Sequence, residues 1–170
     1  MKKLLLGLPI AAALLLGACG ETAVEKVDKE KTPAASEKKK EEKKDVVYKV
    51  GDTVKVNGVE ITITKAAFTA PAEYSEAKNG KVLTLDVKVK NSSDSQAFVD
   101  NTEFGLSYGD TQAEYYYGYN DLAISQELNK GKQATGKLYF DVKPAKSYEL
   151  IYSPTFAFDS KEIKWKISVK

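Results

Sequence analysis

Apolar and polar residues alternate along most of the chain after Asp45, and this period of two is the main structural signal of the sequence. Successive side chains of a β-strand point to opposite faces, so such alternation predicts strands with one buried and one solvated face. No long helical pattern competes with it. The predicted inward-facing sets are Val59, Ile61 and Ile63; Leu83, Leu85, Val87 and Val89; Phe104, Leu106 and Tyr108; Leu138, Phe140 and Val142; Tyr148, Leu150 and Tyr152; and Ile163, Trp165, Ile167 and Val169.

Turn-forming residues separate the predicted strands. Asn57-Gly58 lies between residues 53–56 and 59–64, and this dipeptide supplies the positive φ angles of a type I′ hairpin turn. The cluster Asn91-Ser92-Ser93-Asp94 ends another strand, and Pro144 ends a third because proline cannot continue a central ladder.

An all-β, two-sheet antiparallel sandwich over residues 46–170 is the fold that this pattern favours. A closed barrel is the alternative, and the order of the strands cannot be read from one sequence. The cysteine pair of antibody domains is absent, so packing in the core alone must hold a sandwich together. We expect Trp165 in that core.

The N-terminal segment has the pattern of a secretory signal. Lys2 and Lys3 precede an almost unbroken apolar run over residues 4–16, which is short for a membrane-spanning helix. The run ends in Leu16, Gly17, Ala18 and Cys19, which resemble the lipobox of bacterial lipoproteins. That resemblance implies a diacylglycerol on the Cys19 thiol and cleavage just before it.

Cys19 is the only cysteine of the chain, so it has no disulfide partner. The alternative, an ordinary signal peptide with a chance cysteine, leaves an exported protein with a free thiol open to oxidation. Two acyl chains pass the threshold at which one chain gives only marginal membrane binding. We therefore expect a lipid-anchored protein on the extracellular face of the cell membrane, with no cofactor besides the covalent diacylglycerol on Cys19.

Residues 20–45 carry few large apolar side chains and mix lysine densely with glutamate, so they cannot form a core. As a flexible coil, these residues would span roughly 30 Å, and about 85 Å when fully stretched. A lysine patch for anionic lipid or wall polymer is the alternative interpretation. The predicted organisation is a signal peptide over 1–18, the lipidated cysteine and charged tether over 19–45, and the sandwich domain over 46–170.

The charge balance argues against nucleic-acid binding. The chain has 26 basic and 24 acidic residues, and Lys2 and Lys3 of the signal account for the whole excess. All basic residues are lysines, so the arginine fork that reads guanine edges is missing.

Four blocks of the sequence resemble one known family. They are residues 48–53, 56–63, 85–94 and 136–142, and they are similar to the domain of unknown function found on many Gram-positive surface lipoproteins. That family is related in fold to a secreted mycobacterial immunoprotective antigen with an immunoglobulin-like sandwich. The resemblance covers the chain from Tyr48 to the C-terminus, and it implies fold and location without a catalytic motif. Lys130-Gly131 departs from the Pro-Gly that often precedes the last block.

No enzyme chemistry is expected from the residue types present. The chain has no histidine, which excludes histidine bases and histidine metal sites. Ser75-Glu76-Ala77-Lys78 and residues 36–39 match Ser-x-x-Lys, but the helix and Lys-Thr-Gly strand that this motif needs are missing. Asp94, Asp100, Asn101 and Glu103 match no calcium loop and are typical of turns.

The run Tyr115, Tyr116, Tyr117, Gly118, Tyr119 is the candidate binding patch. Consecutive strand residues point to both faces, so at least one of these tyrosines is expected outside the core. Tyrosine is enriched at protein interfaces. The structural alternative places Tyr115 and Tyr117 on one face and Tyr116 over an edge. A patch at the surface predicts that serine at positions 116 and 119 leaves melting nearly unchanged and abolishes capture of a ligand.

The sequence therefore favours a membrane-anchored, non-enzymatic module that engages an envelope protein or wall glycan. The alternative is an accessory or solute-binding subunit of a membrane transporter. A solute receptor normally needs a cleft between two lobes, and this chain offers one lobe.

Overall fold

The computed structural model describes residues 24–26, 46–121, 123–155 and 162–169. The predicted signal, Cys19 and most of the predicted tether lie outside these residues. The described residues form thirteen β-strands and one short 3-10 helix, and no helix among them is long and apolar enough to cross a membrane. The strands are β1 (Val24–Lys26), β2 (Val47–Lys49), β3 (Thr53–Val56), β4 (Val59–Thr69), β5 (Lys81–Asn91), β6 (Ala97–Asp100), β7 (Phe104–Tyr108), β8 (Thr111–Gln112), β9 (Glu114–Tyr115), β10 (Ser125–Leu128), β11 (Gln133–Val142), β12 (Tyr148–Tyr152) and β13 (Ile163–Ile167).

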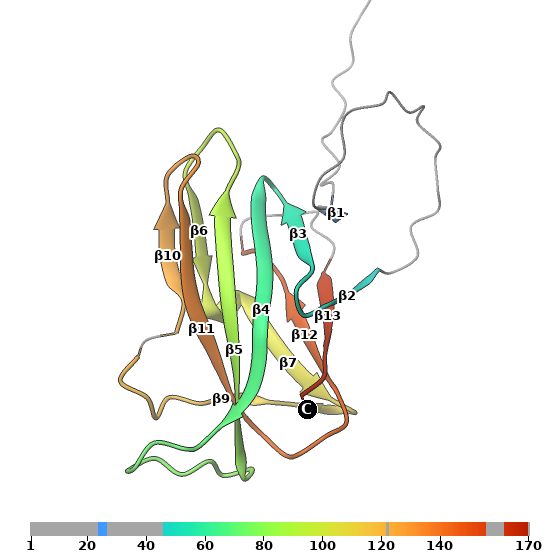
Figure 1. Ribbon diagram of the computed structural model, residues 1–170, viewed down its shortest axis with the longest axis vertical. Helices are drawn as coiled ribbons and strands as arrows, with labels where there is room; N and C mark the ends of the chain where they lie inside the picture. Colours follow the sequence, from blue (N-terminus) through green and yellow to red (C-terminus); the bar gives the residue numbers. More distant parts are fainter. Residues whose placement is uncertain (1–23, 27–45, 122, 156–161, 170) are drawn as a thin grey trace, which may run out of the picture.

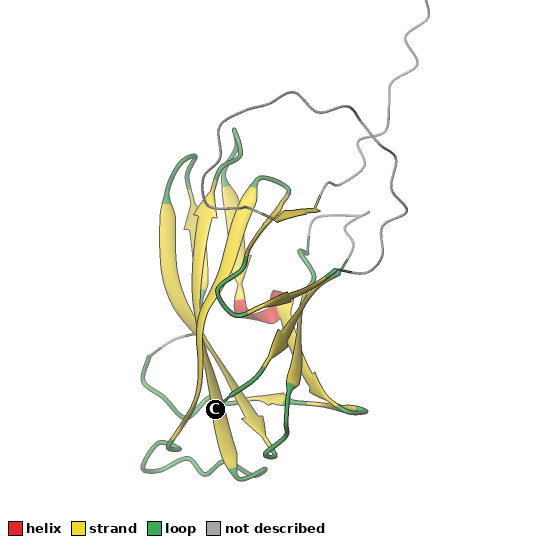
Figure 2. Cartoon of the chain, turned by 45° about the vertical axis from the view of Figure 1, so that its right-hand side comes forward, coloured by secondary structure: helices red, strands yellow, loops and turns green. Residues whose placement is uncertain are grey.

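Two main sheets face each other across the core (Figures 1 and 2). The first sheet has the order β1-β3-β4-β5-β11-β9, and all of its pairs are antiparallel. The second has the order β2-β13-β12-β7-β8, in which only β2 and β13 run parallel. β6 and β10 form a small antiparallel sheet of their own. The predicted all-β sandwich is confirmed.

The core contains the predicted inward-facing side chains. Trp165 is fully buried on β13, as expected, and its ring lies 6.1 Å from that of Tyr48 on β2. The side chains of Leu85 on β5 and Leu150 on β12 come from opposite sheets and belong to the same buried cluster. Burial of apolar surface between the two sheets therefore supplies most of the stabilisation of the fold.

The hairpin predicted at Asn57-Gly58 is confirmed. These two residues have φ angles of 49° and 78°, and Val56 pairs with Val59 across the turn. β4 runs on to Thr69, beyond the residue 64 expected from its alternation. A β-bulge between Ile63 and Lys65 shifts the register there, so the regular period of two stops while the pairing with β5 continues.

Short edge strands were not predicted from the pattern. β1 lies inside the segment expected to be tether, so that prediction is wrong for Val24–Lys26. A three-residue strand can join an existing edge by backbone hydrogen bonds alone and needs no apolar alternation. The ion pair between Lys26 and Asp52, 3.1 Å apart, fastens β1 to the turn before β3.

Asn91 is a fully buried polar residue at the end of β5. Its Nδ2 donates to the backbone carbonyls of Ser95 (2.7 Å) and Leu128 (2.8 Å). Its Oδ1 accepts from the backbone N–H of Ser93 at 2.9 Å. The residue expected only to form a turn therefore joins the β5–β6 turn to the end of β10.

Replacing Asn91 with alanine removes these hydrogen bonds and takes the Asn91 donor away from the carbonyl of the buried Leu128. We expect Asn91→Ala to lower the free energy of unfolding by about 1–3 kcal/mol. Asn129→Ala is the matched control, because Asn129 is exposed in the neighbouring turn; its effect is expected within about 0.5 kcal/mol of zero. Urea unfolding measures both, and equal effects of the two substitutions would contradict the role of Asn91.

Candidate binding surface

Two loops lie together at one end of the sandwich. The first, residues 70–80, joins β4 to β5, and the second, residues 116–124, joins β9 to β10. Figure 1 shows both at the lower left of the molecule. We call their described residues the loop pair. Loops at one end of a rigid sandwich are the usual place for binding residues.

Tyr116 fastens the two loops to each other. Its ring is 5% exposed and packs in a small cluster with Val82 and Tyr139 on the outer side of the first sheet. Its hydroxyl accepts a hydrogen bond from the Ala72 N–H (2.7 Å) and donates one to the Ser75 carbonyl (2.5 Å). The second loop thus fixes the backbone of the first at two points.

Gly118 leaves room for this hydroxyl. A Cβ atom at position 118 would collide with the hydroxyl of Tyr116 and with the Cβ of Ser75. The close approach of the two loops therefore depends on a residue without a side chain at this position.

Tyr119 adds a second connection between the loops. Its hydroxyl donates to the Ala70 carbonyl (2.5 Å) and lies 2.6 Å from the Thr69 hydroxyl. Its ring contacts the rings of Tyr116 and Tyr139, with centroids 5.1 Å and 4.9 Å away. Stacked and edge-on aromatic contacts of this kind stabilise the arrangement beyond the burial of area alone.

Tyr115 belongs to the core rather than to the surface. Its ring stacks on Phe140 with centroids 5.3 Å apart, and its hydroxyl donates to the backbone carbonyls of Phe104 and Asn101. Burial, with smaller contributions from Tyr117 and Asp100, raises the pKa of the Tyr115 hydroxyl.

The four candidate tyrosines therefore do not form one exposed patch. Tyr117 is exposed, at 78%, which confirms that one of them lies outside the core. Tyr115, Tyr116 and Tyr119 point their hydroxyls to partners inside the chain. This geometry argues against the expectation that serine at 116 and 119 leaves melting unchanged, because both hydroxyls hold the first loop in place.

A second exposed tyrosine was missed in the sequence. Tyr74 is 92% exposed and precedes Ser75, whose carbonyl accepts the Tyr116 hydroxyl. No periodicity marks a single aromatic residue within a polar connection, so only the loop geometry reveals it. Together the structure displays Tyr74 and Tyr117 on the loop pair.

Acidic side chains dominate around these two tyrosines. Glu73 and Glu76 lie on the first loop and Asp121 on the second, all exposed, and Glu114 precedes the second loop. Lys78, 3.7 Å from Glu114, is the one lysine among the described residues of the loop pair. The surface is therefore negatively charged at neutral pH.

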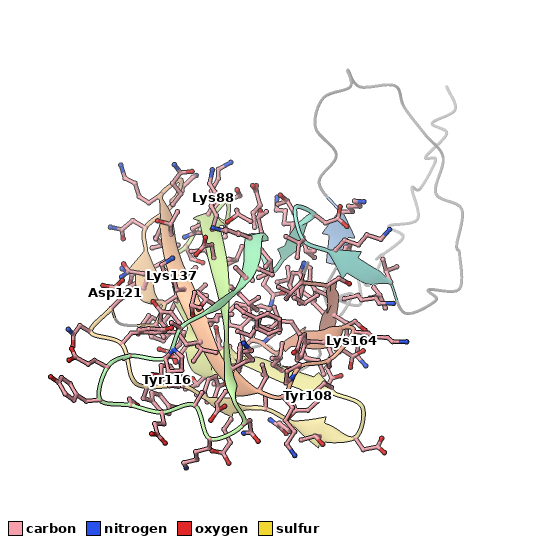
Figure 3. The ribbon with its side chains drawn as sticks, turned by 60° about the horizontal axis from the view of Figure 1, so that its bottom comes forward. Lys88, Tyr108, Tyr116, Asp121, Lys137 and Lys164 are labelled. Carbon is pink, nitrogen blue, oxygen red and sulfur yellow. The ribbon has the colours of Figure 1, made fainter. Side chains whose placement is uncertain are left out.

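A shallow pocket of about 540 Å³ adjoins the second loop on the outer face of the first sheet, between Asp121, Thr64 and Lys137. Lys137 forms an ion pair with Asp86 at 2.7 Å, and this hydrogen bond raises the pKa of the Lys137 ammonium. Figure 3 shows Asp121, Lys137 and Tyr116 on one side of the molecule and Tyr108 and Lys164 on the other. The charges of Asp86 and Lys137 neutralise each other, and Asp121 adds a negative charge to the pocket.

The acids weighed as calcium ligands have partners within the chain. Asp100 Oδ1 accepts from the Thr102 N–H (2.9 Å), and this bond caps the 3-10 helix at Asn101–Glu103. The hydrogen bonds from the Thr102 hydroxyl and from the Thr102 N–H lower the pKa of Asp100. Glu103 is buried and accepts from the Thr155 N–H at 2.9 Å. Asp94 pairs with Lys130 at 2.5 Å in a distant turn. The described residues contain no group of three acidic, histidine or cysteine side chains placed to hold a metal.

The Ser-x-x-Lys match at Ser75 lies in the first loop, not on a helix. The Ser75 carbonyl accepts a hydrogen bond from the Tyr116 hydroxyl, and Lys78 is exposed. The second match, at residues 36–39, and the lipobox with Cys19 lie outside the described residues.

Comparison with known proteins identifies a matching family and similar proteins. The family model described as "Domain of unknown function (DUF4352)" matches residues 48–163. The uncharacterized lipoprotein YcdA of Bacillus subtilis (strain 168) is 30% identical over 117 residues, which covers 65% of this chain and 33% of YcdA. The match thus spans about a third of the length of that relative.

Solved structures of three proteins are similar to this chain. The crystal structure of Bacillus subtilis YcdA aligns with a TM-score of 0.57 and 28% identity over 65% of this chain and 36% of that chain. The Bacillus subtilis yjhA protein aligns with a TM-score of 0.56 and 21% identity over 73% of this chain and 100% of that one. The secreted Mycobacterium tuberculosis protein MPT63 gives a TM-score of 0.46 and 16% identity over 70% and 86% of the two chains.

The hydroxyl of Tyr116 gives a direct test of the loop geometry. We expect Tyr116→Phe to lower the free energy of unfolding by about 1–3 kcal/mol, because the partly buried Ala72 N–H and Ser75 carbonyl lose their partner. Tyr117→Phe is the matched control and should leave it nearly unchanged, since Tyr117 is exposed. Thermal unfolding measures both, and a neutral Tyr116→Phe would show that the hydroxyl does not brace the loops.

Proposed function

This chain belongs to the family described as "Domain of unknown function (DUF4352)", and we propose that it is a lipoprotein of the extracellular membrane face whose sandwich is a non-enzymatic binding module. The module would bind through Tyr74 and Tyr117 on the loop pair. The observation that carries the proposal is that these two exposed aromatic side chains stand on loops braced by buried tyrosines.

The sequence of the N-terminus and the named relative support the anchor. Leu16, Gly17, Ala18 and Cys19 have the lipobox pattern after an apolar signal. YcdA, which matches the sandwich, is named as a lipoprotein. Two acyl chains on Cys19 would bind the membrane stably and leave the sandwich outside.

The exposure of Tyr74 and Tyr117 supports a binding role. A tyrosine that is 92% or 78% exposed contributes little to folding, because most of its ring stays in water. On a binding surface, the same ring offers a large contact area at a low cost in conformational entropy. The hydroxyls of Tyr116 and Tyr119 hold the loop backbone, so little further ordering is needed on binding.

The charge of the loop pair favours an envelope protein as the partner. Three exposed acidic side chains and one lysine lie on the described residues of the loop pair, which suits a partner surface with basic residues. An anionic wall polymer would be repelled by this charge. An uncharged wall glycan is the other candidate that we weighed.

A solute-binding role in a transporter is less well supported. The pocket between Asp121, Thr64 and Lys137 is open, and Asp86 already pairs with Lys137. The described residues form one sandwich and thus one lobe. A thermal shift with small solutes would favour this alternative.

Photo-crosslinking in intact cells tests the proposal. A benzophenone amino acid is placed at position 74 or 117, and for control at Lys88, which is exposed on the outer face of β5. We expect the same protein to be captured from positions 74 and 117 and not from position 88. Capture from none of them, or equally from all three, would contradict the loop pair as the binding surface.

The anchor is tested separately by Cys19→Ala. We expect this variant to lose labelling by a radioactive fatty acid. We also expect its processed form to be lost from the membrane fraction. Unchanged fatty-acid labelling would contradict Cys19 as the attachment site and would say nothing against the loop pair.

A further inference from the structure

β1 covers the outer edge of β3. Val24 pairs with Val56, Glu25 with Lys55 and Lys26 with Val54, all antiparallel, and Figure 1 shows β1 as a short arrow beside β3. Without β1, β3 would be the edge of the first sheet. An open edge with unpaired N–H and C=O groups is a ready site for addition of another strand.

Lys26 fastens β1 through a carboxylate that is already in position. Asp52 Oδ2 accepts a hydrogen bond from the Lys49 N–H at 3.0 Å, and Oδ1 lies 3.1 Å from Lys26 Nζ. The hydrogen bond from Lys49, with the smaller effect of Lys26, lowers the pKa of Asp52, so this carboxylate stays ionised. The hydrogen bond from Lys49 positions Asp52 independently of β1. The ion pair with Lys26 therefore also fixes the register of β1.

The position of β1 in the sequence changes the distance to the membrane. Four residues lie between Cys19 and Val24, so the five residue-to-residue steps span at most about 17 Å. Residues 20–45, counted as a whole, reach up to about 85 Å. Pairing of β1 therefore shortens the connection between the lipid and the sandwich.

We propose that β1 is a detachable clip. When paired with β3, it holds the sandwich close to the membrane; when released, it lets the sandwich move outward and leaves β3 as the edge of the first sheet. Three residue pairs and one half-exposed ion pair are few contacts to hold a strand that is ordered at a cost in chain entropy. This inference rests on the lipid at Cys19 that is part of the proposed function.

Disulfide trapping tests the pairing itself. Residues opposed in an antiparallel pair share a face with closely spaced Cβ atoms, so Glu25→Cys with Lys55→Cys should cross-link under mild oxidation. The control is Glu25→Cys with Lys88→Cys, an exposed position on β5. Preferential cross-linking to position 55 supports the clip, and equal or no cross-linking at both positions overturns it.

Energy transfer tests the distance to the membrane. The lipidated full chain with Lys130→Cys carries a donor dye in the exposed β10–β11 turn, and the vesicles contain acceptor-labelled lipid. Glu25→Pro removes a backbone donor from β1, whereas Glu30→Pro makes the same change outside it. We expect a loss of energy transfer for Glu25→Pro alone.

Equal energy transfer in both proline variants and the parent, at equal melting temperatures, would overturn the clip. Failure of the proposed anchor would look different, since the parent itself would then not bind vesicles. Disulfide trapping between positions 25 and 55 can still be scored in that case, because it does not require a membrane.

Discussion

Burial of side chains between the two sheets holds this sandwich together, because the lone cysteine of the sequence leaves it no disulfide. A fold that depends on burial must satisfy nearly all of the polar groups that it takes out of water, and among the described residues the Trp165 Nε1 is an exception. Asn91 meets this requirement at the end of β5, where it bonds the end of β10, and Glu103 does so at the end of the 3-10 helix, where it bonds the segment after β12. The Tyr152 hydroxyl donates a hydrogen bond to Glu103. Burial, with a smaller contribution from Glu103, raises the pKa of Tyr152 well above its usual range.

The same rule explains the tyrosine-rich segment. Tyr116 buries its ring, Tyr115 and Tyr119 bury theirs in part, and all three have backbone or hydroxyl partners for their oxygens. The hydrogen bonds of Tyr116 and Tyr119 also hold the backbone of the first loop in place, so side chains packed on the first sheet position the loop pair. Tyr74 and Tyr117 are the aromatic residues that this packing leaves in solvent. The proposed binding surface therefore stands on loops that hydrogen bonds tie to each other and to β4.

The sequence was sufficient to predict the features that local rules determine. Asn57-Gly58 specifies its turn by backbone geometry, and the alternation around Trp165 specifies the buried face of β13. β6 and β10 escaped notice because four-residue edge strands carry too little alternation. The hydrogen-bond partners of Tyr116 lie 41 and 44 residues away in the sequence. The connection that Tyr116 makes between the two loops therefore depends on tertiary structure that no spacing in the sequence reveals.

The central claim is that a lipid-anchored sandwich binds its partner through Tyr74 and Tyr117. The most direct measurement is the amount of envelope complex that co-purifies with the full chain after both residues are changed to serine. Phe98→Ser serves as the control, since Phe98 is another exposed aromatic residue, on β6. The account predicts an unchanged melting temperature and loss of the complex for the double variant only; a complex retained at its original level would contradict it.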